Sequence, residues 1–80
     1  MQNKNALEIG DTGNDVHSLQ IRLSGLGFLI NSFEVAKKEF GPDTQEKLKE
    51  FQKFRGLKTS GVLDEITKAV LLEAAFKLGN

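Results

Sequence analysis

The stretch FGPDTQEKLKEFQKFRGL, from Phe40 to Leu57, contains signals for both ends of an amphipathic helix. Pro42 suits the first helical position, because the N–H group that proline lacks would have no partner there. Alternatively, Asp43 is the N-cap and Glu46 completes a capping box three residues later. The helix continues at helical spacing through Leu48 and Phe51, and then through Phe54 or Arg55. Gly56 then favours the end of the helix.

Helices of the same kind are expected on both sides of this stretch. Upstream, Asn14 or Asp15 can cap a helix that follows a tight turn containing Gly10 and Gly13. Its apolar face comprises Val16, Leu19, Leu23 and Leu26. Downstream, Asp64 can cap a third helix. Its wide apolar stripe comprises Ile66, Val70, Leu71, Ala74 and Leu78. The predicted fold class is therefore all-α, a compact three-helix bundle with short glycine-containing connections.

The length of 80 residues suits one domain. Residues 1–6 are expected to be disordered or to originate from cloning, and residues 7–78 are expected to form the domain. Within it, the segment LINSFEVAKKE, residues 29–39, is the least clear. Its first two residues suit an extended piece, and Phe33 to Lys38 suits a helical turn.

The charge balance and the cysteine count exclude several classes of function. Lysine and arginine together number 11, as do aspartate and glutamate. This balance argues against binding to nucleic acid, whose phosphates attract an excess of basic residues, and against an anionic membrane surface. The absence of cysteine excludes disulfides, cysteine-ligated metals and thiol catalysis. No signal peptide and no membrane span is visible, so the residues themselves assign no compartment.

No set of catalytic residues holds together in this sequence. His17 is the only histidine and is expected on the surface, so neither a nucleophilic triad nor a His-rich zinc site can be assembled. Neighbouring carboxylates such as Asp64 and Glu65 lie at a helix start, where capping and the helix dipole explain them. We therefore predict that the protein is not an enzyme and uses no metal or other cofactor.

A glutamine occupies the same place in two similar segments, SLQIRLSGL and EFQKFRGL. These residues, Gln20 and Gln52, indicate an internal helix-loop pseudo-repeat. At the edge of a buried stripe, their amides can satisfy backbone groups of the helix connections. Alternatively, one of them lines a groove and binds a ligand. The structural role is the favoured interpretation. Helix capping or ligand contact is the corresponding choice of role for Asp43, Thr44, Asp64 and Thr67, and capping is the favoured interpretation.

Taken in order, these motifs resemble the peptidoglycan-binding domain family, a small three-helix module attached to bacterial cell-wall hydrolases and other secreted proteins. The first half carries the Gly-x-x-Gly turn at Gly10–Gly13 and the V-x-x-L-Q-x-x-L pattern at Val16–Leu23. The second half carries FGP-x-T at Phe40–Thr44 and G-x-L-D-x-x-T at Gly61–Thr67. The resemblance covers nearly the whole chain, and the ordered set is more specific than any one motif.

The resemblance implies a non-catalytic binding module that attaches a larger protein to bacterial cell-wall peptidoglycan. Its ligand would be the glycan or the stem peptide, bound in a shallow groove. The chain would be monomeric, linked covalently to neighbouring domains, and located in the cell envelope or outside the cell. It would bind no nucleic acid and insert into no membrane. The candidate ligand-binding residues are Gln20, Asp43, Thr44, Gln52, Asp64 and Thr67.

The linker departs from the family pattern, which usually has a glycine just before FG. This chain has AKKE there, at residues 36–39. That departure, together with the absence of Trp and Tyr, favours an alternative function. The alternative is a structural or protein-docking module of a large secreted or toxin-like assembly that keeps the fold without wall binding. An inhibitory pro-segment is disfavoured, because no cysteine is available to ligate a zinc ion.

Overall fold

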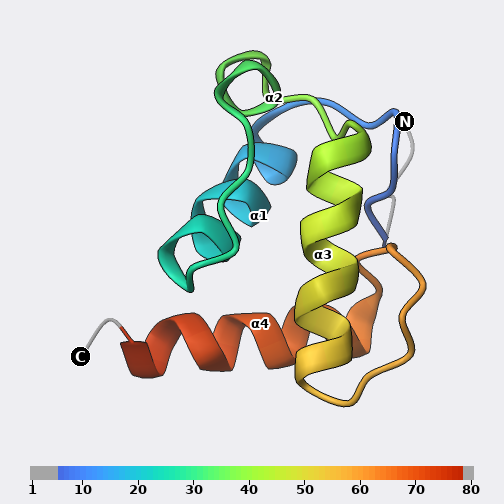
Figure 1. The fold of residues 1–80 in the computed structure, drawn as a ribbon, viewed down its shortest axis with the longest axis vertical. Coiled ribbons are helices and arrows are strands. Elements are labelled where there is room, and N and C mark those ends of the chain that lie inside the picture. The colour runs from blue at the N-terminus through green and yellow to red at the C-terminus, as the bar shows by residue number, and fades with distance from the viewer. Residues whose placement is uncertain (1–5, 79–80) are drawn as a thin grey trace.

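A computed structural model describes residues 6–78 and contains four helices (Figure 1). They are α1 (Asn14–Gly25), α2 (Ser32–Lys37), α3 (Pro42–Phe54) and α4 (Glu65–Leu78). The described part of the chain contains isolated β-bridges but no strand, which confirms the all-α prediction. The three predicted helices correspond to α1, α3 and α4. The expected three-helix architecture is corrected to four helices, because the segment between α1 and α3 forms the short helix α2.

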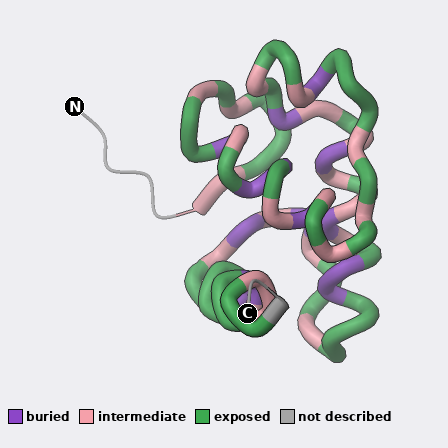
Figure 2. The backbone as a smooth tube through the Cα atoms, turned by 90° about the vertical axis from the view of Figure 1, so that its left-hand side faces the viewer, coloured by how far each residue is buried: buried purple, intermediate pink, exposed green. Residues whose placement is uncertain are grey.

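Helix α1 contacts each of the other three helices. The buried apolar side chains form one core cluster, made of Val16, Leu19, Leu23, Phe40, Leu48, Phe51, Leu63 and Leu71. Phe28 packs its ring nearly perpendicular to that of Phe51, with 5.8 Å between the centroids. Buried positions are interspersed with exposed ones along the chain (Figure 2). Amphipathic helices around one small core produce this alternation.

The N-terminal segment is tied to two loops that lie far along the sequence. Leu7 and Leu63 exchange two backbone hydrogen bonds, of 3.2 and 2.8 Å, in an antiparallel bridge. The Gly10 N–H donates to the carbonyl oxygen of Phe40 at 2.9 Å. These contacts hold the segment against the α3–α4 and α2–α3 connections.

Two of the expected helix caps are wrong. Helix α1 begins directly after Gly13, and neither Asn14 nor Asp15 caps it through a side chain. The φ of +115° at Gly13 turns the chain sharply into the helix, a conformation that glycine adopts readily. Helix α3 begins at Pro42, as the proline signal predicts, but Asp43 is not its cap. A carboxylate from another helix has that role.

The exposure of three residues differs from expectation, and one of them is Phe54 of α3, which is 77% exposed. Ile66 is 68% exposed, although it was predicted in the apolar stripe. Helix α4 is apolar on several sides, and its buried face passes through Thr67 and Leu71 instead. His17, expected on the surface, is half-buried, and its Nδ1 is shielded from solvent without a hydrogen-bond partner among the described residues.

The predicted disorder of residues 1–6 falls largely, over residues 1–5, outside the described residues. The boundaries expected for the domain, 7–78, stay a prediction. No helix in the described range has the length and apolarity needed to cross a bilayer.

Candidate functional site

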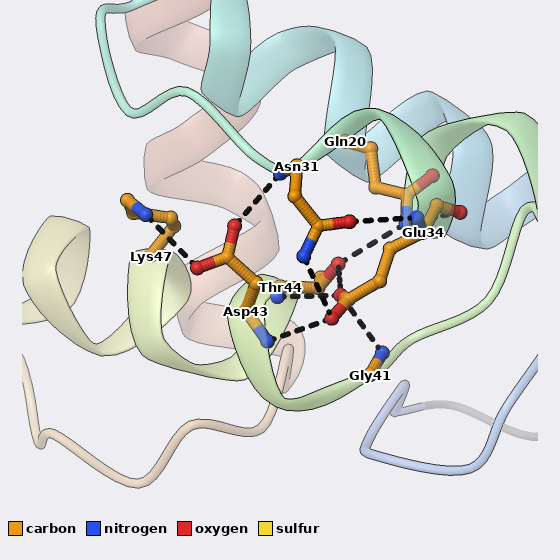
Figure 3. A network of polar contacts seen from close by, with 7 residues as sticks. All are labelled: Gln20, Asn31, Glu34, Gly41, Asp43, Thr44 and Lys47. Atoms are coloured by element: carbon orange, nitrogen blue, oxygen red, sulfur yellow. Dashed lines mark hydrogen bonds and ion pairs between the residues drawn. The ribbon is translucent and has the colours of Figure 1, made fainter.

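The carboxylate of Glu34, on α2, caps the start of α3 (Figure 3). It accepts hydrogen bonds from the backbone N–H groups of Gly41, Asp43 and Thr44, at 3.1, 2.9 and 2.8 Å. The Thr44 hydroxyl donates a fourth, at 2.7 Å. Donors at a helix start have no partner within the helix and need an external acceptor. We call this arrangement the Glu34 cap; it has the role that the alternative interpretation of the sequence gave to Asp43.

The Glu34 cap holds a buried carboxylate in its charged form. Burial raises the pKa of Glu34, but the hydrogen bonds just described, above all that of the Thr44 hydroxyl, outweigh burial and hold the pKa below its ordinary value. The positive end of the α3 dipole favours the same charge. The fit is close, because a Cβ atom at Gly41 would lie only 2.6 Å from the Glu34 Cδ. A side chain at position 41 would therefore displace the Glu34 carboxylate.

Gln20, on α1, lies beside the Glu34 cap and is fully buried. Its Nε2 donates to the carbonyl oxygens of Glu34 and Glu39, at 3.3 and 2.9 Å. The same nitrogen donates to the Thr44 hydroxyl oxygen at 3.1 Å. Gln20 therefore links α1 to α2, to the turn that follows α2, and to the start of α3.

Gln52, on α3, makes a similar set of contacts and is also fully buried. Its Nε2 donates to the Val62 carbonyl oxygen and to the Thr67 hydroxyl oxygen, both at 3.1 Å. Its Oε1 accepts from the Gly61 N–H at 2.9 Å. At the start of α4, the Asp64 carboxylate accepts a hydrogen bond from the Thr67 N–H at 2.8 Å, which confirms the predicted cap of that helix.

The six candidate residues from the sequence fall into two groups. One group, at the Glu34 cap, comprises Gln20, Asp43 and Thr44. The other, at the start of α4, comprises Gln52, Asp64 and Thr67. The glutamines and threonines are at most 2% exposed and offer almost no surface to a ligand. The carboxylates accept backbone N–H groups, which lower the pKa of both Asp43 and Asp64. These contacts agree with the favoured structural role, and direct contact with a ligand stays a prediction.

A partly open groove lies where the N-terminal segment, α1, α4 and the loop before α4 meet, with a volume of about 300 Å³. Its apolar lining consists of Leu7, Leu19, Leu63, Leu71 and Leu72. Its polar lining consists of Asp15, Ser18, Arg22 and Lys68. We call this the α1–α4 groove. None of the six candidate residues is among the described residues that line it.

The polar lining follows from spacing on α1. Asp15, Ser18 and Arg22 stand at positions i, i+3 and i+7, which share one side of a helix. This signal was present in the sequence, but the opposite wall, with Lys68, comes from a distant segment. Within residues 6–78, no side-chain hydrogen bond or ion pair engages Asp15, Arg22 or Lys68. Their charges therefore remain available to a ligand.

The lining has the composition of a binding groove. Hydrolysis of a glycosidic bond uses two carboxyl groups that flank the substrate, whereas the described lining has one, that of Asp15. Across the described range, no group of His, Cys, Asp and Glu side chains is placed to hold a metal ion. The groove instead combines an apolar floor with charges of both signs, features that fix the orientation of a bound molecule.

The chain matches one protein family and is similar to several solved structures. Residues 12–71 match the family described as "Putative peptidoglycan binding domain". The N-terminal domain of SleB has a TM-score of 0.81 and 33% identity, over 90% of this chain and 96% of that one. A peptidoglycan-binding protein from Clostridioides difficile, solved with glutamine hydroxamate, has a TM-score of 0.75 and 29% identity. That match covers 82% of this chain but only 39% of the clostridial one. The search of curated proteins found no match.

Proposed function

The chain belongs to the peptidoglycan-binding domain family, and we propose on that basis that it is a non-catalytic module that attaches a larger protein to bacterial cell-wall peptidoglycan. The observation that carries the proposal is the α1–α4 groove, whose charged side chains are not engaged by other described residues. The cell envelope or the space outside the cell is the location that follows from this function.

A groove of this size supports a mechanism of weak contacts repeated along the wall. Its volume of about 300 Å³ lies at the lower end of the range for ligand sites. Modest affinity is sufficient for a tethered module, because covalent linkage to a neighbouring domain raises the effective concentration at a polymeric ligand. The module would thus keep an attached domain close to its place of action.

The two buried glutamines have a positioning role in this proposal. Gln52 donates to the carbonyl oxygen of Val62, the neighbour of Leu63, and Leu63 lines the groove. Gln52 also donates to the Thr67 hydroxyl oxygen at the start of α4. The Nε2 of each glutamine donates to a threonine hydroxyl oxygen at 3.1 Å, that of Gln52 to Thr67 and that of Gln20 to Thr44. We take the shared pairing as support for the internal repeat expected from the sequence, with each glutamine anchoring one connection.

Sedimentation of the purified chain with isolated peptidoglycan sacculi tests the proposal. We expect saturable binding by the folded wild type. Leu72→Asp places a charge in the groove and should weaken binding at least tenfold. Ile66→Asp is the matched control, because Ile66 is also an exposed apolar residue of α4 but does not line the groove. Circular dichroism verifies that both variants fold. Absence of binding by the folded wild type would refute the proposal.

The alternative, a docking module that keeps the fold without wall binding, is favoured by a different observation. Several large apolar side chains are between 68% and 77% exposed, namely Leu29, Phe33, Phe54, Ile66 and Phe76. Where such side chains gather into one contiguous patch, they form a contact surface for another protein. The same sedimentation experiment separates the two functions, since a docking module would leave sacculi unbound.

A further inference from the structure

The charges that α1 contributes to the α1–α4 groove are separated by sign along the helix. Asp15 lies in the first turn of α1, Arg22 lies in its last turn, and Lys68 lies on the opposite wall, on α4. We infer that the groove takes the stem peptide of peptidoglycan and not the glycan, and that it binds a peptide segment with a free ammonium group toward Asp15 and a carboxylate toward Arg22, while Lys68 adds a second positive charge to the groove. This inference rests on the proposed function and specifies the part of the wall that is recognised.

The lining argues against a sugar as the ligand. Sugar rings are commonly bound by stacking on aromatic side chains and by amide side chains that match their hydroxyl groups. The described lining contains neither aromatic nor amide side chains, and Ser18 supplies its only hydroxyl group. A glycan strand, moreover, has no ammonium group to pair with Asp15. Asp15 would then lie beside the ligand without a partner.

The dimensions and the floor of the groove fit a short peptide. Asp15 and Arg22 are seven residues apart on one helix, or about 10 Å along its axis. An extended peptide covers that distance in about three residues. The apolar lining includes Leu7, which is half-buried, and Leu72, which is exposed, and the methyl groups of the alanines in a stem peptide can pack against them.

The test uses two soluble probes of the wall in calorimetry or NMR titrations at low salt. One is a synthetic stem tetrapeptide with a free diamino-acid amine and free carboxylates, and the other is glycan strands freed of peptide by an amidase. We expect the wild type to bind the tetrapeptide at least tenfold more tightly than the glycan. Acetylation of the amine, or amidation of the carboxylates, should each weaken binding about tenfold, as expected for loss of a charge-assisted contact.

Matched variants show which side chain faces which end of the peptide. Arg22→Gln should weaken binding of the free peptide and remove most of the effect of amidation. Asp15→Asn should do the same for acetylation. Lys53→Gln and Glu46→Gln change exposed charges on α3, outside the groove, and should leave both effects intact. A variant that merely misfolds would not lose sensitivity to one end alone.

The outcomes separate this inference from the proposed function. If the folded wild type fails to sediment with sacculi, the proposed function falls and this inference falls with it. If the wild type sediments with sacculi but binds peptide-free glycan as tightly as the tetrapeptide, the inference alone is overturned. Retention of the amidation effect in Arg22→Gln, or of the acetylation effect in Asp15→Asn, overturns it as well.

Discussion

Replacing Glu34 by glutamine tests whether the Glu34 cap stabilises the fold. The two side chains have nearly the same size, so packing is preserved. The carboxylate uses Oε1 for the donors of Gly41 and Thr44 and Oε2 for the Asp43 N–H. In Glu34→Gln one oxygen becomes an NH₂ group. With the amide oxygen at the Oε1 position, this NH₂ group faces the Asp43 N–H, donor against donor.

The size of the effect follows from the bonds that are weakened. A hydrogen bond to a charged group contributes about 1.5–3 kcal/mol, and removal of a negative charge from a helix start costs roughly a further 0.3–1 kcal/mol. We expect Glu34→Gln to lower the free energy of unfolding by about 3 kcal/mol. A domain of 80 residues has a total of about 4–12 kcal/mol, so the variant loses a quarter of its stability or more.

Urea denaturation followed by circular dichroism measures this loss, and thermal unfolding should show a fall in Tm of about 12–24 °C. Glu46→Gln is the matched control, because Glu46 is exposed on the same helix and takes no part in the cap. The control should change the free energy of unfolding by no more than about 0.5 kcal/mol. A loss of less than about 1 kcal/mol in Glu34→Gln would refute the reasoning.

The difference in stability between the wild type and Glu34→Gln should depend on pH. A carboxyl group whose pKa is lower in the folded state stabilises the protein above its unfolded pKa, and this contribution is lost as the pH falls through the folded pKa. The pKa of Glu34 lies below its ordinary value of 4.5. The stability difference between wild type and Glu34→Gln should therefore be full at neutral pH and shrink below 4.5. Asp43 and Asp64 titrate in both proteins, so the difference isolates Glu34. A difference that stays constant down to the acid unfolding of the domain contradicts the assignment.

Three further substitutions probe the connections by urea or thermal unfolding. Gly41→Ala should lower the free energy of unfolding by about 2 kcal/mol, because the new Cβ displaces the Glu34 carboxylate. In a Glu34→Gln background this loss should be smaller. Losses that add fully in the double variant would argue against a shared contact. Lys38→Gly should stabilise the domain by about 1 kcal/mol, because Lys38 has a left-handed φ of +55°; an unchanged or lower Tm would count against it. Gln52→Leu should cost about 2–3 kcal/mol and speed amide hydrogen exchange at Gly61, whose N–H loses its acceptor; unaltered exchange there would disprove the role of that bond.

Helices α1, α3 and α4 were predictable because their signals are local. Pro42 marks the start of α3, and Leu48 and Phe51 mark its apolar face within the next three turns. Gln20 and Gln52 were predictable in kind, since a polar side chain beside a core residue indicates a buried amide that satisfies backbone groups. Both glutamines bond main-chain carbonyl oxygens, as that interpretation requires.

Helix α2 and the buried face of α4 were harder to predict, for different reasons. Helix α2 has six residues, too few to be stable alone, and its Phe33 is 77% exposed, so its apolar residues do not mark its buried face. Glu34 gains its partners only when the start of α3 packs against α2. Helix α4 has so many apolar positions that periodicity could not select Thr67 over Ile66 as the buried residue.

Neighbouring residues thus specified which segments are helical, where most of them begin and end, and the family to which the chain belongs. Packing alone specified which carboxylate caps α3 and where the groove lies, because the groove brings together Leu7, Arg22 and Lys68 from three separate segments. The physical reason is the range of the forces. Helical periodicity and capping act within one or two turns, whereas a groove depends on the relative placement of whole helices, which the combined contacts of the core determine.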